Sequence, residues 1–99
     1  TKHHEEYANE KKMFQPGAIL HEVIAGALKS KGTGFEAWCR ENGLHPTTVR
    51  QATYGQSGGD RGQAILGQLI AAAGVDVVEA AYRQRMLIEA QKLGGEVAA

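Results

Sequence analysis

Apolar residues recur along most of the chain at spacings of three and four, which is typical of helices that bury one face. The first clear stripe consists of pairs four residues apart, Ile19–Leu20, Val23–Ile24 and Ala27–Leu28. Pro16 precedes this stripe, and proline suits the first position of a helix because its missing N–H has no partner there anyway. We therefore predict a helix over residues 16–31.

Four more helices follow from the same pattern, each ended by a glycine or by a glycine-rich loop. The expected ranges are 35–42, 46–54, about 63–73 and 76–93, with a loop over 56–62. Short runs in which apolar and polar residues alternate, as they do in strands, are absent. The sequence therefore predicts an all-α fold, a compact five-helix bundle.

Residues 35–54 form two short predicted helices joined by a turn at Gly43, the arrangement of a helix-turn-helix. Such a unit needs a small residue where the helices cross, a glycine in the turn, an apolar anchor after it and apolar residues beneath the second helix. The residues that meet these needs are Cys39, Gly43, Leu44, Val49 and Ala52, with Trp38 filling the space between the helices. We predict that this segment is a helix-turn-helix.

The polar side chains left on the second of these helices are of the kinds that read base edges in the major groove. They are Thr47, Thr48, Arg50, Gln51 and Tyr54. Arg50 suits guanine, Gln51 suits adenine, and threonine methyl groups can contact thymine. Double-stranded DNA, bound through its major groove, is therefore the expected partner.

Net charge does not strengthen this hypothesis, because 11 basic residues balance 11 acidic ones and DNA-binding domains are usually basic. Between Lys29 and Arg61 the balance is +2, from five basic and three acidic residues. This is a weak basic patch.

Length and composition place the chain among globular proteins. Its 99 residues, of which 42% are hydrophobic, suit one domain. No apolar run is long enough for a membrane span, and the polar residues 1–12 do not resemble a signal peptide. We expect a cytoplasmic protein that does not bind a membrane.

The stretch from about Ile19 to Ala73 resembles the Xre/Cro-like helix-turn-helix domains of lambdoid phage repressors, with Gly55 as the glycine that follows the recognition helix. The resemblance implies a lambda-repressor-like fold and base contacts from Pro46, Thr47 and Gln51. It also implies DNA backbone contacts from Thr33, Gly34, Arg61 and Gln63. Phe35 stands where the family commonly has a glutamine.

The last predicted helix carries apolar residues on more than one face, and surplus apolar surface usually marks a partner site. A two-fold dimer would also double the contacts on a palindromic DNA site. We therefore predict a homodimer whose interface includes Val78, Tyr82, Met86 and Leu87. The expected organisation is a flexible arm over 1–13, a DNA-binding domain over 14–75 and a dimerisation helix over 76–99.

The function that these features favour is a sequence-specific transcriptional regulator, a repressor of phage or mobile-element type. The alternative is a protein-interaction module of the same fold, antitoxin-like or bound to RNA polymerase, and the neutral charge favours it. We expect no enzymatic activity, because no paired carboxylates or activated nucleophile can be assembled.

No cofactor and no metal are expected either. The His3–His4 pair is too small for a metal site and suits a solvated tail. The glycine-rich run 58–62 lacks the Lys-Ser/Thr ending of a phosphate loop. Cys39 suits the core, and His45 suits a helix cap or a position beside a phosphate.

Overall fold

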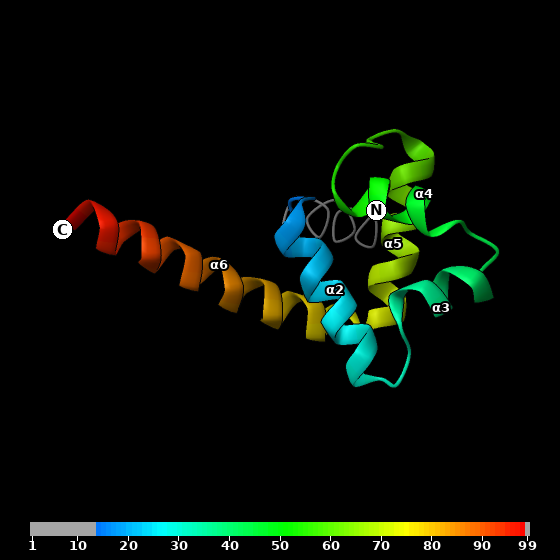
Figure 1. Ribbon diagram of the computed structural model, residues 1–99, viewed down its shortest axis with the longest axis horizontal. Helices are drawn as coiled ribbons and strands as arrows, with labels where there is room; N and C mark the ends of the chain where they lie inside the picture. The colour runs from blue at the N-terminus through cyan, green and yellow to red at the C-terminus, as the bar shows by residue number, and fades with distance from the viewer. Residues whose placement is uncertain (1–13, 99) are drawn as a thin grey trace, which may run out of the picture.

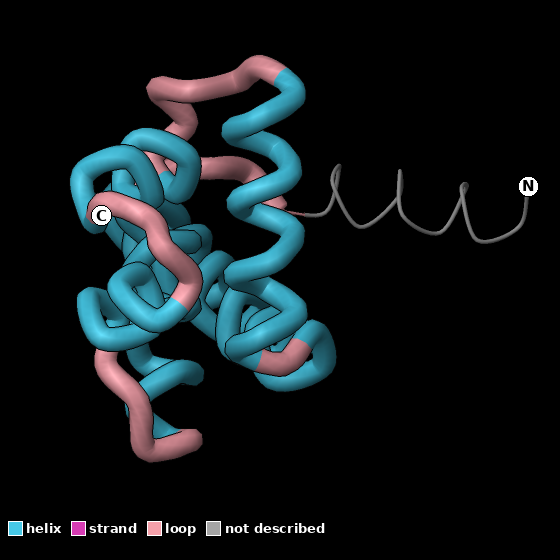
Figure 2. The backbone as a smooth tube through the Cα atoms, turned by 90° about the vertical axis from the view of Figure 1, so that its right-hand side faces the viewer, coloured by secondary structure: helices cyan, strands magenta, loops and turns pink. Residues whose placement is uncertain are grey.

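The computed structural model describes residues 14–98, and within that range the chain is helical with no strand (Figures 1 and 2). The helices are α2 (Ala18–Ser30), α3 (Phe35–Glu41), α4 (Pro46–Thr53), α5 (Asp60–Ala73) and α6 (Val75–Ala98). The predicted all-α class and all five helices are confirmed. The proposed arm over residues 1–13, with His3 and His4, lies outside the described residues.

The core is built from the apolar stripes that the spacing predicted. On α2 the stripe buries Leu20, Ile24 and Leu28 completely. Leu69 of α5 is equally buried. Fully burying a side chain of this size contributes about 1.5–3 kcal/mol, so these interlocked stripes hold the helices together.

Helices α2 to α5 form a body from which α6 projects (Figure 1). The corner between α5 and α6 is Gly74, whose φ of 99° favours glycine. The first turns of α6 still belong to the body, because Val78 and Tyr82 are buried in the common core. Tyr82 also holds the chain before α2: its hydroxyl accepts a hydrogen bond from the Gln15 N–H at 3.1 Å, and its ring meets the Phe14 ring edge-on.

Two helix starts differ from the prediction by two residues or more. Helix α2 begins at Ala18 and not at Pro16, because the Gly17 N–H donates to the Thr53 carbonyl at 2.8 Å and holds this segment against the end of α4. Helix α5 begins at Asp60, inside the expected loop. Gly62 is buried in its first turn, where a side chain would overlap the Ser57 carbonyl. That glycine therefore permits close packing.

The end of α6 also differs, since the helix continues through Gly94 to Ala98. No single helix among the described residues is long and apolar enough to cross a membrane. Two helices taken together, α5 and α6 up to Gly94, reach that length and composition, but they meet at a 98° bend. Much of the apolar surface of α5 is buried in the core.

Candidate nucleic-acid interface

The turn between α3 and α4 is fixed by local hydrogen bonds. Gly43 adopts a positive φ of 68°, and the Leu44 N–H donates to the Cys39 carbonyl at 2.8 Å. His45 caps α4, since its Nδ1 accepts from the Thr47 N–H at 3.2 Å. Pro46 occupies the first position of the helix. The predicted turn at Gly43, the predicted start of a helix at residue 46 and the His45 cap are confirmed.

Beneath the turn the two helices pack as the sequence predicted. Cys39 and Val49 are fully buried, and Ala52 and Trp38 are nearly so. Leu44 is partly buried against the same cluster. Burial raises the pKa of the Cys39 thiol, so this cysteine remains protonated and suits a purely structural role. The helix pair is thus held rigidly from inside.

The opposite side of α4 faces solvent. Thr47, Arg50, Gln51 and Tyr54 are exposed, while Pro46 and Thr48 are half-buried. The predicted base-contact residues therefore lie on one short helix and on its C-cap, Tyr54. Two of them, Arg50 and Tyr54, are already engaged by other side chains of the chain.

Arg50 reaches back to the first turn of α3. Its Nη2 lies 3.0 Å from Oε2 of Glu36, and its guanidinium lies 5.3 Å from the centre of the Phe35 ring. Phe35 is buried, whereas both charged side chains remain about half exposed, at 44% for Arg50 and 59% for Glu36. The guanidinium is therefore held by an aromatic face and a carboxylate.

His21 of α2 supports this arrangement from the other side. Its ring stacks on Tyr54 and meets Phe35 edge-on, with 4.8 Å between ring centres in both pairs. The buried Thr53 hydroxyl donates to the Arg50 carbonyl at 3.0 Å, so at 2.9 Å it accepts from Nδ1 of His21. Burial, and then the nearby Arg50 charge, lower the pKa of His21, which keeps the imidazole neutral near pH 7.

This cluster around His21 was missed in the sequence, which gave His21 no role. The signal available was its position: residue 21 flanks the buried stripe of 20, 24 and 28 on α2. Nothing in the sequence indicated that α4 would supply its hydroxyl partner.

The residues expected to contact the DNA backbone lie at the ends of neighbouring elements. Gly34 is the N-cap of α3, and Thr33 precedes it, half-buried. Arg61 is exposed in the first turn of α5. Gln63, also exposed, donates from Nε2 to the Gly58 carbonyl at 3.1 Å, which ties the loop to the helix.

The basic residues between positions 29 and 61 do not form one patch. The Lys31 amine lies beside Gly74, at the end of α5, whereas Arg61 lies at its start. These positions are about 20 Å apart along a helix that rises 1.5 Å per residue. Within the described range, neither cation forms an ion pair. Any phosphate contacts they make would be separate.

The predicted dimer residues divide into two groups, which corrects the expected interface. Val78 and Tyr82 are buried in the core of their own chain, so they offer no surface to a second copy. Met86 and Leu87 are exposed at 41% and 58%, and Ile88 and Leu93 are exposed beside them. Apart from Val77 in the first turn, which is 47% exposed, the exposed large apolar side chains of α6 therefore begin one turn later than Tyr82.

A second feature of the body is an apolar groove of about 440 Å³ beside α5. Its large apolar side chains include Phe14, Leu66, Ile70 and Val75, and its small ones include Gly62, Gly67 and Ala71. The groove also borders the loop after α4 at Gly55, Ser57 and Gly58.

Among residues 14–98, no three His, Cys, Asp or Glu side chains lie close enough together to hold a metal ion. No protein-family model matches the chain, and no curated protein or solved structure matches it.

Proposed function

We propose that the protein is a sequence-specific DNA-binding regulator that inserts α4 into the major groove of duplex DNA. The observation that carries this proposal is the two-sided character of α4. Val49 and Ala52 of α4 are buried in the core together with Cys39 of α3, while Thr47, Arg50 and Gln51 of α4 face solvent. A short helix held rigidly and presenting such side chains meets the needs of a recognition helix.

In this proposal the N-terminal end of α4 points toward the bases, as recognition helices do. Gln51 pairs with adenine and Arg50 with guanine, and both pairings are bidentate. Gly34 and Arg61, at the starts of α3 and α5, would lie against phosphates. Occupying a promoter in this way represses transcription without any chemistry, so a phage-type repressor is the preferred regulator.

The far part of α6 supports a homodimer as the active form. Met86, Leu87, Ile88 and Leu93 are exposed there on a helix that projects from the body (Figure 1). Pairing this segment across a two-fold axis would cover these side chains and place two copies of α4 on a palindromic site.

The test is a salt titration of binding to random-sequence duplex DNA, comparing the wild type with the double variant Arg50→Ala, Gln51→Ala. We expect wild-type affinity to fall steeply with salt, because phosphate contacts release counterions. On a selected site the double variant loses its sequence preference. Arg83→Ala, which removes an exposed arginine of α6, is the matched control and leaves sequence preference unchanged. Absence of binding at low salt contradicts the proposal.

A second candidate function is recognition of a protein partner, and the apolar groove beside α5 favours it. A groove lined by Phe14, Leu66 and Ile70 suits an apolar side chain of another protein, and this binding needs no basic surface. In that case DNA does not bind, and substitutions in the groove, not in α4, abolish the activity.

A further inference from the structure

The Arg50–Glu36 pair lies at the centre of the surface that the proposed function assigns to DNA. Arg50 is on the solvent side of α4, and its Nη2 is 3.0 Å from the Glu36 carboxylate. A guanine base would have to approach the same guanidinium that Glu36 occupies. The free protein therefore holds its main candidate guanine reader in an internal contact.

The partners of Arg50 are themselves fixed in place. Phe35 is buried beneath the guanidinium, and its ring packs edge-on against His21. The Arg50 carbonyl accepts from the buried Thr53 hydroxyl. Because the backbone and the aromatic face are both held, the contact that can be exchanged at low cost is the exposed ion pair with Glu36.

Glu36 also places a negative charge on a surface that phosphates would approach. Exposed ion pairs are weak, so a ligand that offers better acceptors can displace this carboxylate. Both guanine and a phosphate can accept from the two prongs of the guanidinium fork. Guanine is neutral, however, whereas a phosphate carries a negative charge that the Glu36 carboxylate repels. The carboxylate therefore disfavours phosphate, which its charge repels, more than it disfavours neutral guanine.

We propose that Glu36 is a specificity-determining residue: it holds Arg50 away from non-specific phosphates and releases it to the neutral pair of acceptors on a guanine. This inference rests on the proposed DNA-binding function. It assigns a second role to Glu36, whose charge in the first turn of α3 already favours the N-terminal end of that helix.

The experiment measures the affinity of Glu36→Gln for random-sequence duplex DNA at low salt, in wild-type and Arg50→Ala backgrounds. Glu41→Gln is the matched control, because Glu41 is also exposed on α3 and forms no ion pair within the described range. It removes the same charge without releasing Arg50. Circular dichroism establishes that the variants remain folded.

We expect Glu36→Gln to tighten binding to random DNA by about two- to fivefold, the range that breaking an exposed ion pair allows. Glu41→Gln should tighten it less. In the Arg50→Ala background the effect of Glu36→Gln should fall to that of Glu41→Gln, because no guanidinium remains to be released.

An equal effect of Glu36→Gln in both backgrounds would overturn the inference and leave the proposed function standing. So would weaker binding by Glu36→Gln, which would mean that the carboxylate orients Arg50 for DNA. Absence of binding by every protein, the wild type included, would overturn the proposed function and this inference with it.

Discussion

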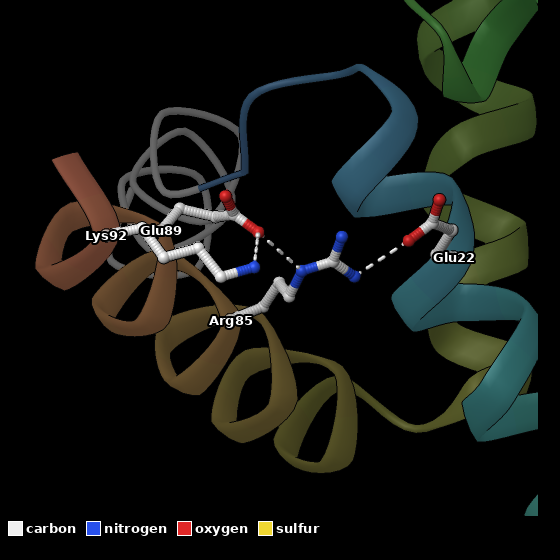
Figure 3. A network of polar contacts seen from close by, with 4 residues as sticks. All are labelled: Glu22, Arg85, Glu89 and Lys92. Atoms are coloured by element: carbon white, nitrogen blue, oxygen red, sulfur yellow. Dashed lines mark hydrogen bonds and ion pairs between the residues drawn. The ribbon is translucent and has the colours of Figure 1, made fainter. Parts of the chain in front are cut away.

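In the body formed by α2 to α5, apolar side chains point inward, whereas beyond Tyr82 the helix α6 turns polar side chains toward α2. Arg85 bridges the two helices: its Nη1 lies 2.7 Å from Glu22 on α2, and its Nε lies 3.1 Å from Glu89 (Figure 3). Over the same turns the apolar residues Met86, Leu87 and Ile88 face solvent. This part of α6 is therefore inverted relative to the body.

The inversion explains why α6 has no single apolar face. Its first turns bury Val78 and Tyr82 in the core. Its later turns carry an ion pair from Arg85 to Glu22 on α2, between side chains that are 37% and 54% exposed. Exposed ion pairs contribute little to stability. The common core therefore ends at Tyr82, and the far part of α6 leaves apolar side chains exposed.

The largest expected effect comes from the same substitution in the two regions. Leu69→Ala in α5 removes a fully buried side chain and should lower the free energy of unfolding by about 2–5 kcal/mol. Leu87→Ala in α6 removes a side chain that is 58% exposed and should change it by about 0.5 kcal/mol or less. Urea unfolding at low protein concentration measures both. A large loss of unfolding free energy from Leu87→Ala that persists on dilution would contradict the difference between the two regions.

The body also contains a buried polar contact, formed by the Thr53 hydroxyl. Substitution of Thr53 tests how much that contact contributes to stability. Thr53→Val deletes a buried hydroxyl that bonds to both His21 and the Arg50 carbonyl, so it should cost about 1–3 kcal/mol. Thr48→Val on the same helix is the control and should cost about 0.5 kcal/mol or less. Similar losses from both substitutions would mean that the hydrogen bonds of the buried hydroxyl do not add to the free energy of unfolding.

The His21 contact should make stability depend on pH. Because the pKa of His21 is lowered from 6.5 by burial and by Arg50, the unfolded chain takes up a proton before the folded one. The stabilisation is present above pH 6.5 and is lost as the pH falls through the folded-state pKa. We expect the free energy of unfolding of the wild type to decrease over this range more than that of His21→Asn. Parallel pH profiles would contradict the lowered pKa.

The smallest effect is expected at the junction of α2 and α6. Arg85→Ala removes the link to Glu22 and should speed amide hydrogen exchange in residues 86–93 with little change in global unfolding. Arg83→Ala removes only a contact with Glu79 within α6 and is the control. Equal exchange in the two variants would show that Arg85 does not hold α6 against α2.

Helix content and core followed from the sequence because the buried stripes of α2 and α5 repeat at helical spacing, and because the glycines at 43, 55 and 74 end helices or form turns. The turn at Gly43 and the exposed side of α4 were predictable for the same reason. The pairing of Arg50 with Glu36, residues 14 positions apart, was not. It depends on how α3 and α4 cross, and a local pattern does not encode that.

The dimer residues show the same limit. Val78 and Tyr82 were expected on the surface, since the sequence of α6 does not say how many of its turns the body covers. The answer depends on the corner at Gly74 and on the segment at Phe14 that packs against Tyr82. Both are tertiary features.

The central claim, that α4 binds duplex DNA, is tested most directly by amide chemical-shift mapping at low salt with a short random-sequence duplex. We predict that the shifts concentrate in Thr47–Tyr54, with further changes at Gly34 and Arg61, and that they diminish as salt is added. Shifts confined to the groove at Leu66 and Ile70, or no shifts at all, would contradict the claim.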